Sequence, residues 1–261
     1  MRDFEYAGKR LSDFGFVICN FGGKGLETVE GVKIAFELAP VQNGSQNHLI
    51  MTQYEECLET TIQVCLNPCS GDNMEISSFV FREMTKWLCR KQFLKFKFLS
   101  EEYLDIYYES IINVSKIELD GKLVGLELHI LCNRPFALKE PQTFIINNTE
   151  VNGSHSINDA SQEEGFIYPH TEITVKQDGV LRIRNLLENR TTEIKGCTAN
   201  EVITMDYPII SSNLSTHKIQ NDFNWNFLRI ANTYDKSRND LEISLPCTIK
   251  LKYSPIVKVG L

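Results

Sequence analysis

DIYYESIINVSKIELDGKLVGLELHILCN (residues 105–133) decides the fold class of this chain. Apolar and polar side chains alternate on both sides of Asp120-Gly121, and alternation with a period of two is typical of strands that bury one face. An Asp-Gly pair between two such runs is a strong signal for a two-residue hairpin turn. The stretch therefore predicts two long antiparallel strands joined at residues 120–121.

One segment departs from this alternation. Between Met74 and Cys89 the apolar residues recur at spacings of three and four, which predicts an amphipathic helix. Asp72 followed by Glu75 resembles a capping box, with Asp in place of Ser or Thr. Two cations, Arg90-Lys91, follow the helix, where positive charge suits the helix dipole. We expect this to be the only helix of the chain.

The remaining chain is also predicted to be β. Short strand-like runs with turn signals between them fill the second half and favour a sandwich or jelly roll, and Gln177-Asp178-Gly179 is the clearest hairpin turn among them. Pro135 and Pro141 interrupt the strand pattern and mark the best domain boundary. The fold class is therefore mainly β, with one helix in the first half and a β-sandwich in the second.

Composition and charge narrow the class of protein. The 261 residues carry a net charge of −7, which argues against the basic surface needed for tight nucleic-acid binding. The start, MRDFEYAGKRLSDFG, lacks the apolar core of a signal peptide, and no run approaches the roughly 18 apolar residues of a membrane span. We expect the protein to be made and used without crossing a membrane by its own signal.

Eight cysteines and five histidines are scattered along the chain. The cysteines are Cys19, Cys57, Cys65, Cys69, Cys89, Cys132, Cys197 and Cys247. None forms a C-x-x-C pair, and the histidines do not supply zinc-ligand spacing. Free, mostly buried thiols of a reducing cytoplasm are the expected state, with a metal site as the weaker alternative. No cofactor is predicted.

Motifs for covalent or phosphate chemistry are missing from the sequence. The GGKG run at 22–25 lacks Walker spacing, and neither G-x-S-x-G nor H-E-x-x-H occurs. A Ser-His-Asp triad needs no sequence motif, but no residue pattern points to one. The sequence therefore favours a protein that is not an enzyme.

The acidic and aromatic stretch FLSEEYLDIYYESI (98–111) is the one candidate for sugar chemistry in the first half. A glycosidase needs two carboxylates on opposite sides of one sugar, about 5 to 9.5 Å apart. Strand alternation instead predicts a polar face made of Asp105, Tyr107 and Glu109. The opposite, packed face is made of Ile106, Tyr108 and Ser110. Glu101 and Glu102 fall in the preceding turn, so a strand with one wet face is the favoured interpretation.

A carbohydrate-binding module remains the alternative for the second half. Jelly rolls often bind sugars through aromatic side chains, and the candidates here are Tyr168, Trp225 and Tyr234. Trp225 and Phe227 alternate onto one side of FNWNFLRI, and core packing is the favoured role for Trp225.

The order of motifs resembles a known family, the distal tail proteins of long-tailed bacteriophages (siphovirus-type) and prophages. The motifs that carry the resemblance are FEYAGKRLSDFGF (4–16), the helix ending TKWLC, FKFLSEEYLDIYYESI, HILCNRPFALKEP, EVITMDYPIISS and DFNWNFLRIANTYDKSRNDLEISLPCTIKLKYSP. Each is weak alone, but together and in this order they cover nearly the whole chain.

The resemblance implies a two-domain architecture. It gives a tail-tube-like β-sandwich or split barrel with one helix at residues 1–138, which forms a ring. A galectin-like β-sandwich follows at 139–247. In the family the last strand, here about 248–261, often returns to the first domain.

The resemblance also implies a structural role in the virion. Six copies would form a baseplate hub at the tail tip, assembled in the host bacterial cytoplasm. The implied partners are other copies of the chain, the tail tube protein, a tail-associated hub or lysin protein and receptor-binding proteins, with DNA passing through the lumen. The candidate oligomer or docking surface comprises Gln42, Asn43, Gln46, Glu101, Glu102, Asp105 and Glu109. The tail-tube subunit itself is a further reading, made less attractive by the second sandwich.

Overall fold

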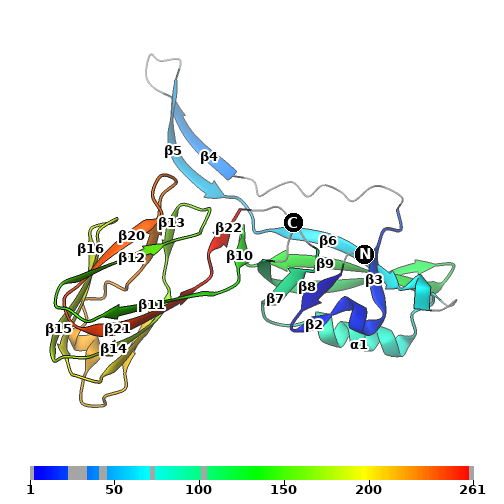
Figure 1. Ribbon diagram of the computed structural model, residues 1–261. Helices are drawn as coiled ribbons and strands as arrows, with labels where there is room; N and C mark the ends of the chain where they lie inside the picture. The colour runs from blue at the N-terminus through cyan, green and yellow to red at the C-terminus, as the bar shows by residue number, and fades with distance from the viewer. Residues whose placement is uncertain (1–2, 23–33, 41–45, 71–73, 101–104, 259–261) are drawn as a thin grey trace. The chain divides into compact units, whose positions relative to one another are not determined.

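The computed structural model describes residues 3–22, 34–40, 46–70, 74–100 and 105–258. The chain divides into two compact units (Figure 1). Unit 1 comprises residues 1–138 with 258–261, and unit 2 comprises 139–257.

Unit 1 is built on one antiparallel sheet with the strand order β2-β1-β7-β8-β9-β6-β3, and β10 pairs with β8. The strands are β1 (Phe4–Tyr6), β2 (Lys9–Arg10), β3 (Phe16–Cys19), β6 (Glu59–Leu66), β7 (Leu94–Phe98), β8 (Ile106–Leu119), β9 (Lys122–Cys132) and β10 (Ala137–Lys139). The predicted hairpin is confirmed, since β8 and β9 pair from Ser110 opposite Cys132 to Leu119 opposite Lys122. Asp120 and Gly121 both take positive φ at the turn, as Asp-Gly turns require.

The helix α1 (Ser78–Leu88) lies inside the predicted range but begins later. Ser77 is its N-cap, and the Ser77 hydroxyl accepts a hydrogen bond from the Val80 N–H. The Ile76 N–H donates instead to the carbonyl of Leu123, so the residues before the cap are held extended by the sheet. The capping box predicted from Asp72 and Glu75 was therefore wrong at Glu75, and Asp72 lies outside the described residues.

Aromatic rings join α1 to the sheet. Trp87 is 2% exposed and stacks on Phe4 and Phe14, with ring centroids 5.9 and 4.5 Å apart. The Trp87 indole N–H donates to the carbonyl of Tyr6 at 2.9 Å, so burial leaves its one polar atom satisfied. Phe96 in β7 continues the cluster beside Phe4. The core of unit 1 therefore lies between α1 and this sheet.

A separate two-stranded sheet, β4 (Ile34–Pro40) with β5 (Asn47–Tyr54), also belongs to unit 1. Within the described residues it pairs with no other strand, and Figure 1 shows it as a ribbon of its own. The remaining elements of the unit are two short 3₁₀ turns, η1 (Leu11–Phe14) and η2 (Pro68–Ser70).

Unit 2 is a β-sandwich. One sheet has the order β11-β21-β14-β17-β18 and the other β12-β20-β15-β16, with a small β13–β19 pair beside them. The strands are β11 (Gln142–Asn148), β12 (Gly153–Asn158), β13 (Gly165–Ile167), β14 (His170–Val175), β15 (Gly179–Asn185), β16 (Arg190–Cys197), β17 (Val202–Asp206), β18 (Ile209–Ser212), β19 (Ile230–Asn232), β20 (Arg238–Ile243), β21 (Cys247–Tyr253) and β22 (Ile256–Val257). Of the segment 248–261, residues up to Tyr253 pair with β11 and β14.

The core of unit 2 is formed by alternate residues of both sheets, such as Ile173 and Ile249 from one and Ile183 and Leu241 from the other. The mainly β fold class is thus confirmed. A second helix, α2 (Ile219–Asp222), was missed because a single turn carries no periodic pattern. The hairpin predicted at Gln177-Asp178-Gly179 was wrong, because the strands on either side of it, β14 and β15, belong to different sheets of the sandwich.

Candidate assembly and ligand-binding surfaces

The β4–β5 hairpin is amphipathic, and its apolar face is open to solvent. Directly paired residues of an antiparallel ladder point to the same side, so alternation along β4 and the pairing of Leu38 with Leu49 define one face. That face, here called the hairpin face, comprises Ile34, Phe36, Leu38 and Leu49, which are 42%, 63%, 51% and 57% exposed. The opposite side carries mainly polar or small residues, among them Ala35, Glu37 and Gln53, together with Met51, which is paired with Glu37 and 46% exposed.

An isolated hairpin with an exposed apolar face is expected to be unstable unless another surface covers that face. Two-stranded sheets are marginally stable in water, and contiguous exposed apolar side chains mark interaction surfaces. The alternation in IAFEL predicts the strand but not what covers its apolar side, so sequence reasoning missed the hairpin face. Its exposure makes it the best assembly surface in the described part of unit 1.

The predicted docking residues are only partly described. Gln42, Asn43, Glu101 and Glu102 lie outside the described residues, whereas Gln46 and Asp105 are exposed. Glu109 is engaged within the subunit, because its carboxylate accepts from Asn133 Nδ2 at 2.7 Å and lies 3.4 Å from Arg134.

The predicted two-faced strand at the start of β8 is half right. Ile106 and Tyr108 are 4% and 1% exposed, which confirms the packed face. Tyr107 is also buried, at 8%, so its assignment to the wet face was wrong. The reason is a neighbour on β7: the Lys95 ammonium lies 4.6 Å from the centre of the Tyr107 ring and covers it.

Unit 2 presents a chain of touching aromatic side chains. Tyr168 and Tyr207 stack with centroids 4.2 Å apart and planes 16° apart. Phe227, only 4% exposed, meets Tyr207 edge-on at 5.3 Å and Trp225 at 6.4 Å. Tyr207 and Trp225 are each 56% exposed. These residues, together with Phe166 and Arg229, are called the aromatic surface below.

Trp225 is held at the surface by its backbone. Its φ is 59°, and left-handed backbone is unusual for a bulky side chain. Asn224 fixes the turn, since its Oδ1 accepts from the Asn226 N–H and its Nδ2 donates to the carbonyl of Thr191. The core role expected for Trp225 is therefore wrong, because the left-handed turn directs it outward while Phe227 takes the buried position.

A half-hidden ion pair borders the aromatic surface. The Arg229 guanidinium lies 3.6 Å from the centre of the Phe166 ring and donates to the Tyr168 hydroxyl at 3.4 Å. It also pairs with Glu188 at 2.7 Å, and the two side chains are 19% and 9% exposed. Burial acts to lower the pKa of Arg229, but the hydrogen bonds to Glu188 and Tyr168 outweigh it and the pKa is raised. Arg229 is therefore a fixed cation.

The third predicted sugar contact lies elsewhere on unit 2. Tyr234 is 68% exposed and lines an open depression with residues that include Asp159 and Asn232. Tyr168 and Trp225 are thus brought together by the fold, and Tyr207, which the sequence analysis did not select, completes their surface.

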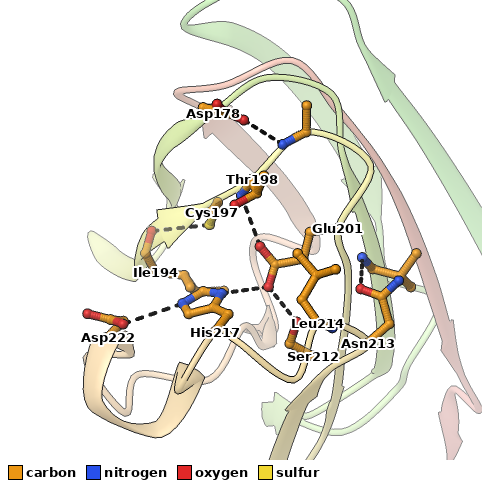
Figure 2. Close-up of polar contacts among 12 residues, drawn as sticks. Asp178, Ile194, Cys197, Thr198, Glu201, Ser212, Asn213, Leu214, His217 and Asp222 are labelled. Atoms are coloured by element: carbon orange, nitrogen blue, oxygen red, sulfur yellow. Dashed lines mark hydrogen bonds and ion pairs between the residues drawn. The ribbon is translucent and has the colours of Figure 1, made fainter.

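A buried polar cluster lies beside α2, and it contains a Ser, a His and acids (Figure 2). Glu201 is fully buried and accepts from Ser212 Oγ, from the Thr198 N–H and from His217 Nδ1. His217 also lies 3.5 Å from Asp222. Ser212 and His217 both bond to Glu201 rather than to each other, so this is not a nucleophile with its base.

The cluster has a structural role instead. Burial acts to raise the pKa of Glu201, but the hydrogen bonds from Ser212, Thr198 and His217 outweigh it and lower the pKa. Glu201 thereby ties α2 and the loop before it to the sandwich.

The cysteines are free thiols, as expected, and half of them are buried. The buried ones are Cys65, Cys132, Cys197 and Cys247. Burial raises the pKa of Cys132 and of Cys247 to about 12, which keeps them protonated and unreactive. Among the described residues no group of three or more His, Cys, Asp or Glu is placed to hold a metal. No helix in the described part of the chain is long and apolar enough to cross a membrane.

Comparison with known proteins adds the family. A family model described as a phage tail protein N-terminal domain matches residues 1–134, and one described as a phage tail C-terminal domain matches 136–253. A search of curated proteins finds no match.

A solved structure supports the fold over the whole length. The chain superposes on the crystal structure of the SPP1 Dit protein, described as a paradigm of the hub adsorption apparatus in phages that infect Gram-positive bacteria. The TM-score is 0.67 at 11% identity, over 97% of this chain and 99% of that one. The resemblance drawn from the sequence is confirmed: this chain belongs to the phage tail protein family defined by these two domains, and it has the fold of the Dit tail protein.

Proposed function

We propose that this chain is a non-enzymatic subunit of a homohexameric ring, a hub that joins the tail tube to the tail-tip or baseplate adhesion apparatus. The observation that carries the proposal is the hairpin face, an apolar strip with 42% to 63% exposure on an isolated two-stranded sheet. A second copy of the chain is the occupant that a self-assembling hub supplies to every hairpin.

A closed ring follows from the kind of contact that the hairpin makes. A projecting hairpin on one copy must dock on a different surface of its neighbour, which is a heterologous contact. Heterologous contacts give rings when the rotation closes, and every copy then donates one hairpin and receives one. The number six is what the family resemblance implies. Gln46 and Asp105, both exposed, are proposed to border the contact or a docking face.

The proposed division of labour follows the two units. The first domain builds the ring, and the second serves as a docking platform for receptor-binding and other tail-tip proteins. The tail tube protein and a hub or lysin protein bind the two faces of the ring. A net charge of −7 suits a lumen through which DNA passes, because an acidic wall repels phosphate rather than holding it. The ring is assembled in the host cytoplasm and remains in the virion.

Native mass spectrometry of the purified full chain over a wide concentration range tests the proposal. A discrete species of six subunits supports a closed ring, while a ladder of sizes indicates open filaments. A monomer at every concentration, combined with no ring in tail particles that contain the protein, would refute it. A variant with the hairpin face made polar is the control for contacts that do not use the hairpin.

A further inference from the structure

The aromatic surface of unit 2 has features that neither folding nor ring assembly explains. We propose that it is a carbohydrate-binding site that takes the pyranose rings of a neutral polysaccharide chain. The proposal does not rest on the ring, because all of its residues lie in unit 2.

Trp225 occupies a position that is unfavourable for its side chain. A left-handed φ of 59° suits Gly or Asn and disfavours a bulky residue. The fold gains little in return, since the residue stays 56% exposed. Backbone held in a disfavoured region with an exposed functional side chain is typical of ligand sites. A sugar-binding role accounts for a tryptophan that the core does not require.

The side chains of the aromatic surface are held in place by packing and hydrogen bonds. Tyr168 and Tyr207 stack on each other, and Tyr207 and Trp225 both rest on the buried Phe227. The turn beneath Trp225 is fixed by the two hydrogen bonds of Asn224. The exposed rings therefore lose little further freedom when a ligand lands on them. The C–H faces of a pyranose offer the flat apolar surface that such rings can cover.

Glu188, the ion-pair partner of Arg229, has hydrogen-bonding capacity that the described residues do not use. Glu188 uses Oε2 for Arg229, while its Oε1 has no hydrogen-bond partner among the described residues. A nine-tenths buried carboxylate oxygen that lacks a donor is costly. A ligand hydroxyl is a donor of the kind that this oxygen lacks. Arg229 in turn offers N–H groups to ring and hydroxyl oxygens.

The same atoms decide the class of ligand. Glu188 and Arg229 carry opposite charges and pair with each other, so the site offers no net charge to attract an anionic or a cationic polymer. A purely apolar protein side chain would leave the Glu188 oxygen without a donor. A neutral, hydroxyl-rich ligand with flat apolar faces fits both the rings and the ion pair, and a polysaccharide has this chemistry.

The two tryptophans of the chain provide a direct assay. Trp87 is 2% exposed in unit 1 and Trp225 is 56% exposed, so quenching by acrylamide reports on Trp225. The full chain is screened on an array of neutral glycans and then titrated with cellohexaose, chitohexaose and maltohexaose. The expected result is binding of at least one glycan, with the quenchable tryptophan signal protected.

Variants then locate the site by calorimetry with the glycan that binds. Trp225→Gly tolerates the left-handed backbone, and with Tyr168→Ala it should weaken binding by roughly tenfold or more. Tyr234→Ala, which removes an even more exposed aromatic side chain outside the surface, should leave binding unchanged.

Three results would overturn the proposal. The first is no binding to any glycan on the array or in millimolar solution. The second is binding that survives Trp225→Gly and Tyr168→Ala or is lost only in Tyr234→Ala. The third is protection of Trp225 by another tail protein and by no glycan, which would make the aromatic surface a protein-docking site.

Discussion

Replacing the hairpin face with polar residues should prevent assembly and leave the subunit folded. The triple variant Phe36→Thr, Leu38→Thr and Leu49→Thr removes three of its four apolar side chains. Threonine is chosen because it is β-branched and favours strands, while it removes most of the apolar surface. The subunit itself buries these side chains only in part, so the truncations should cost its own stability about 1 kcal/mol or less per site.

The magnitude follows from the exposed fractions. Full burial of a Leu or Phe side chain stabilises by about 1.5–3 kcal/mol, and the three side chains are 63%, 51% and 57% exposed in the subunit. Covering the remaining surface is therefore worth about 1 kcal/mol each, or about 3 kcal/mol for each subunit contact. Since each 1.4 kcal/mol is tenfold in affinity, every contact should weaken by roughly a hundredfold.

Sedimentation velocity of wild type and variant at matched concentrations measures this loss, and a thermal melt checks the fold. The control is Ala35→Thr with Gln53→Thr, a directly paired position on the opposite side of the same hairpin. It should assemble like wild type. If the triple variant has the wild-type distribution of species, the hairpin face is not the assembly contact and the argument for it fails.

Other predictions concern unit 2. Glu201→Gln should destabilise it by about 2 kcal/mol at neutral pH, seen as a lower melting temperature, and wild-type melting temperatures at neutral pH would contradict the role of the buried cluster. The folded-state pKa of Glu201 is lowered, so the stabilisation by its carboxylate is fully present above the unfolded pKa of about 4.3 and is lost as pH falls through the folded value. The melting temperature of Glu201→Gln should therefore fall less steeply than that of wild type between neutral and acid pH. Trp225→Gly should be more stable than Trp225→Ala by about 1 kcal/mol in urea unfolding, since the two truncations differ only in their tolerance of positive φ; equal stabilities would remove the argument from strain. Asn239→Ala should cost about 3 kcal/mol, because Asn239 is fully buried and its amide bonds to both the N–H and the carbonyl of Ala231; a cost below about 1 kcal/mol would show that water replaces these bonds.

Local chemistry explains what the sequence predicted well. The turn at Asp120-Gly121 depends on the φ preferences of two adjacent residues, so this residue pair was sufficient to predict the hairpin. Long alternating runs predicted the mainly β class, because the alternation of buried and exposed side chains is a property of each strand by itself. The helix was found from its period, but its start was misplaced because the N–H of Ile76 bonds to Leu123, a strand residue far along the chain.

The candidate surfaces were harder, because exposure depends on what packs from elsewhere. Alternation placed Tyr107 on the wet face, but Lys95 from a neighbouring strand covers its ring. It also placed Trp225 on the same side as Phe227, but the left-handed backbone at Trp225 directs its side chain outward while Phe227 is buried. The aromatic rings of Tyr168 and Tyr207 meet only in the folded sandwich, so no local pattern could pair them.

The most direct test of the central claim is negative-stain imaging of the purified full-length protein. The account predicts closed rings with six-fold symmetry and a central channel, and it predicts that the hairpin-face variant yields single subunits under the same conditions. Wild-type images that show only single subunits or open filaments, together with tail particles that lack such a ring, would contradict it.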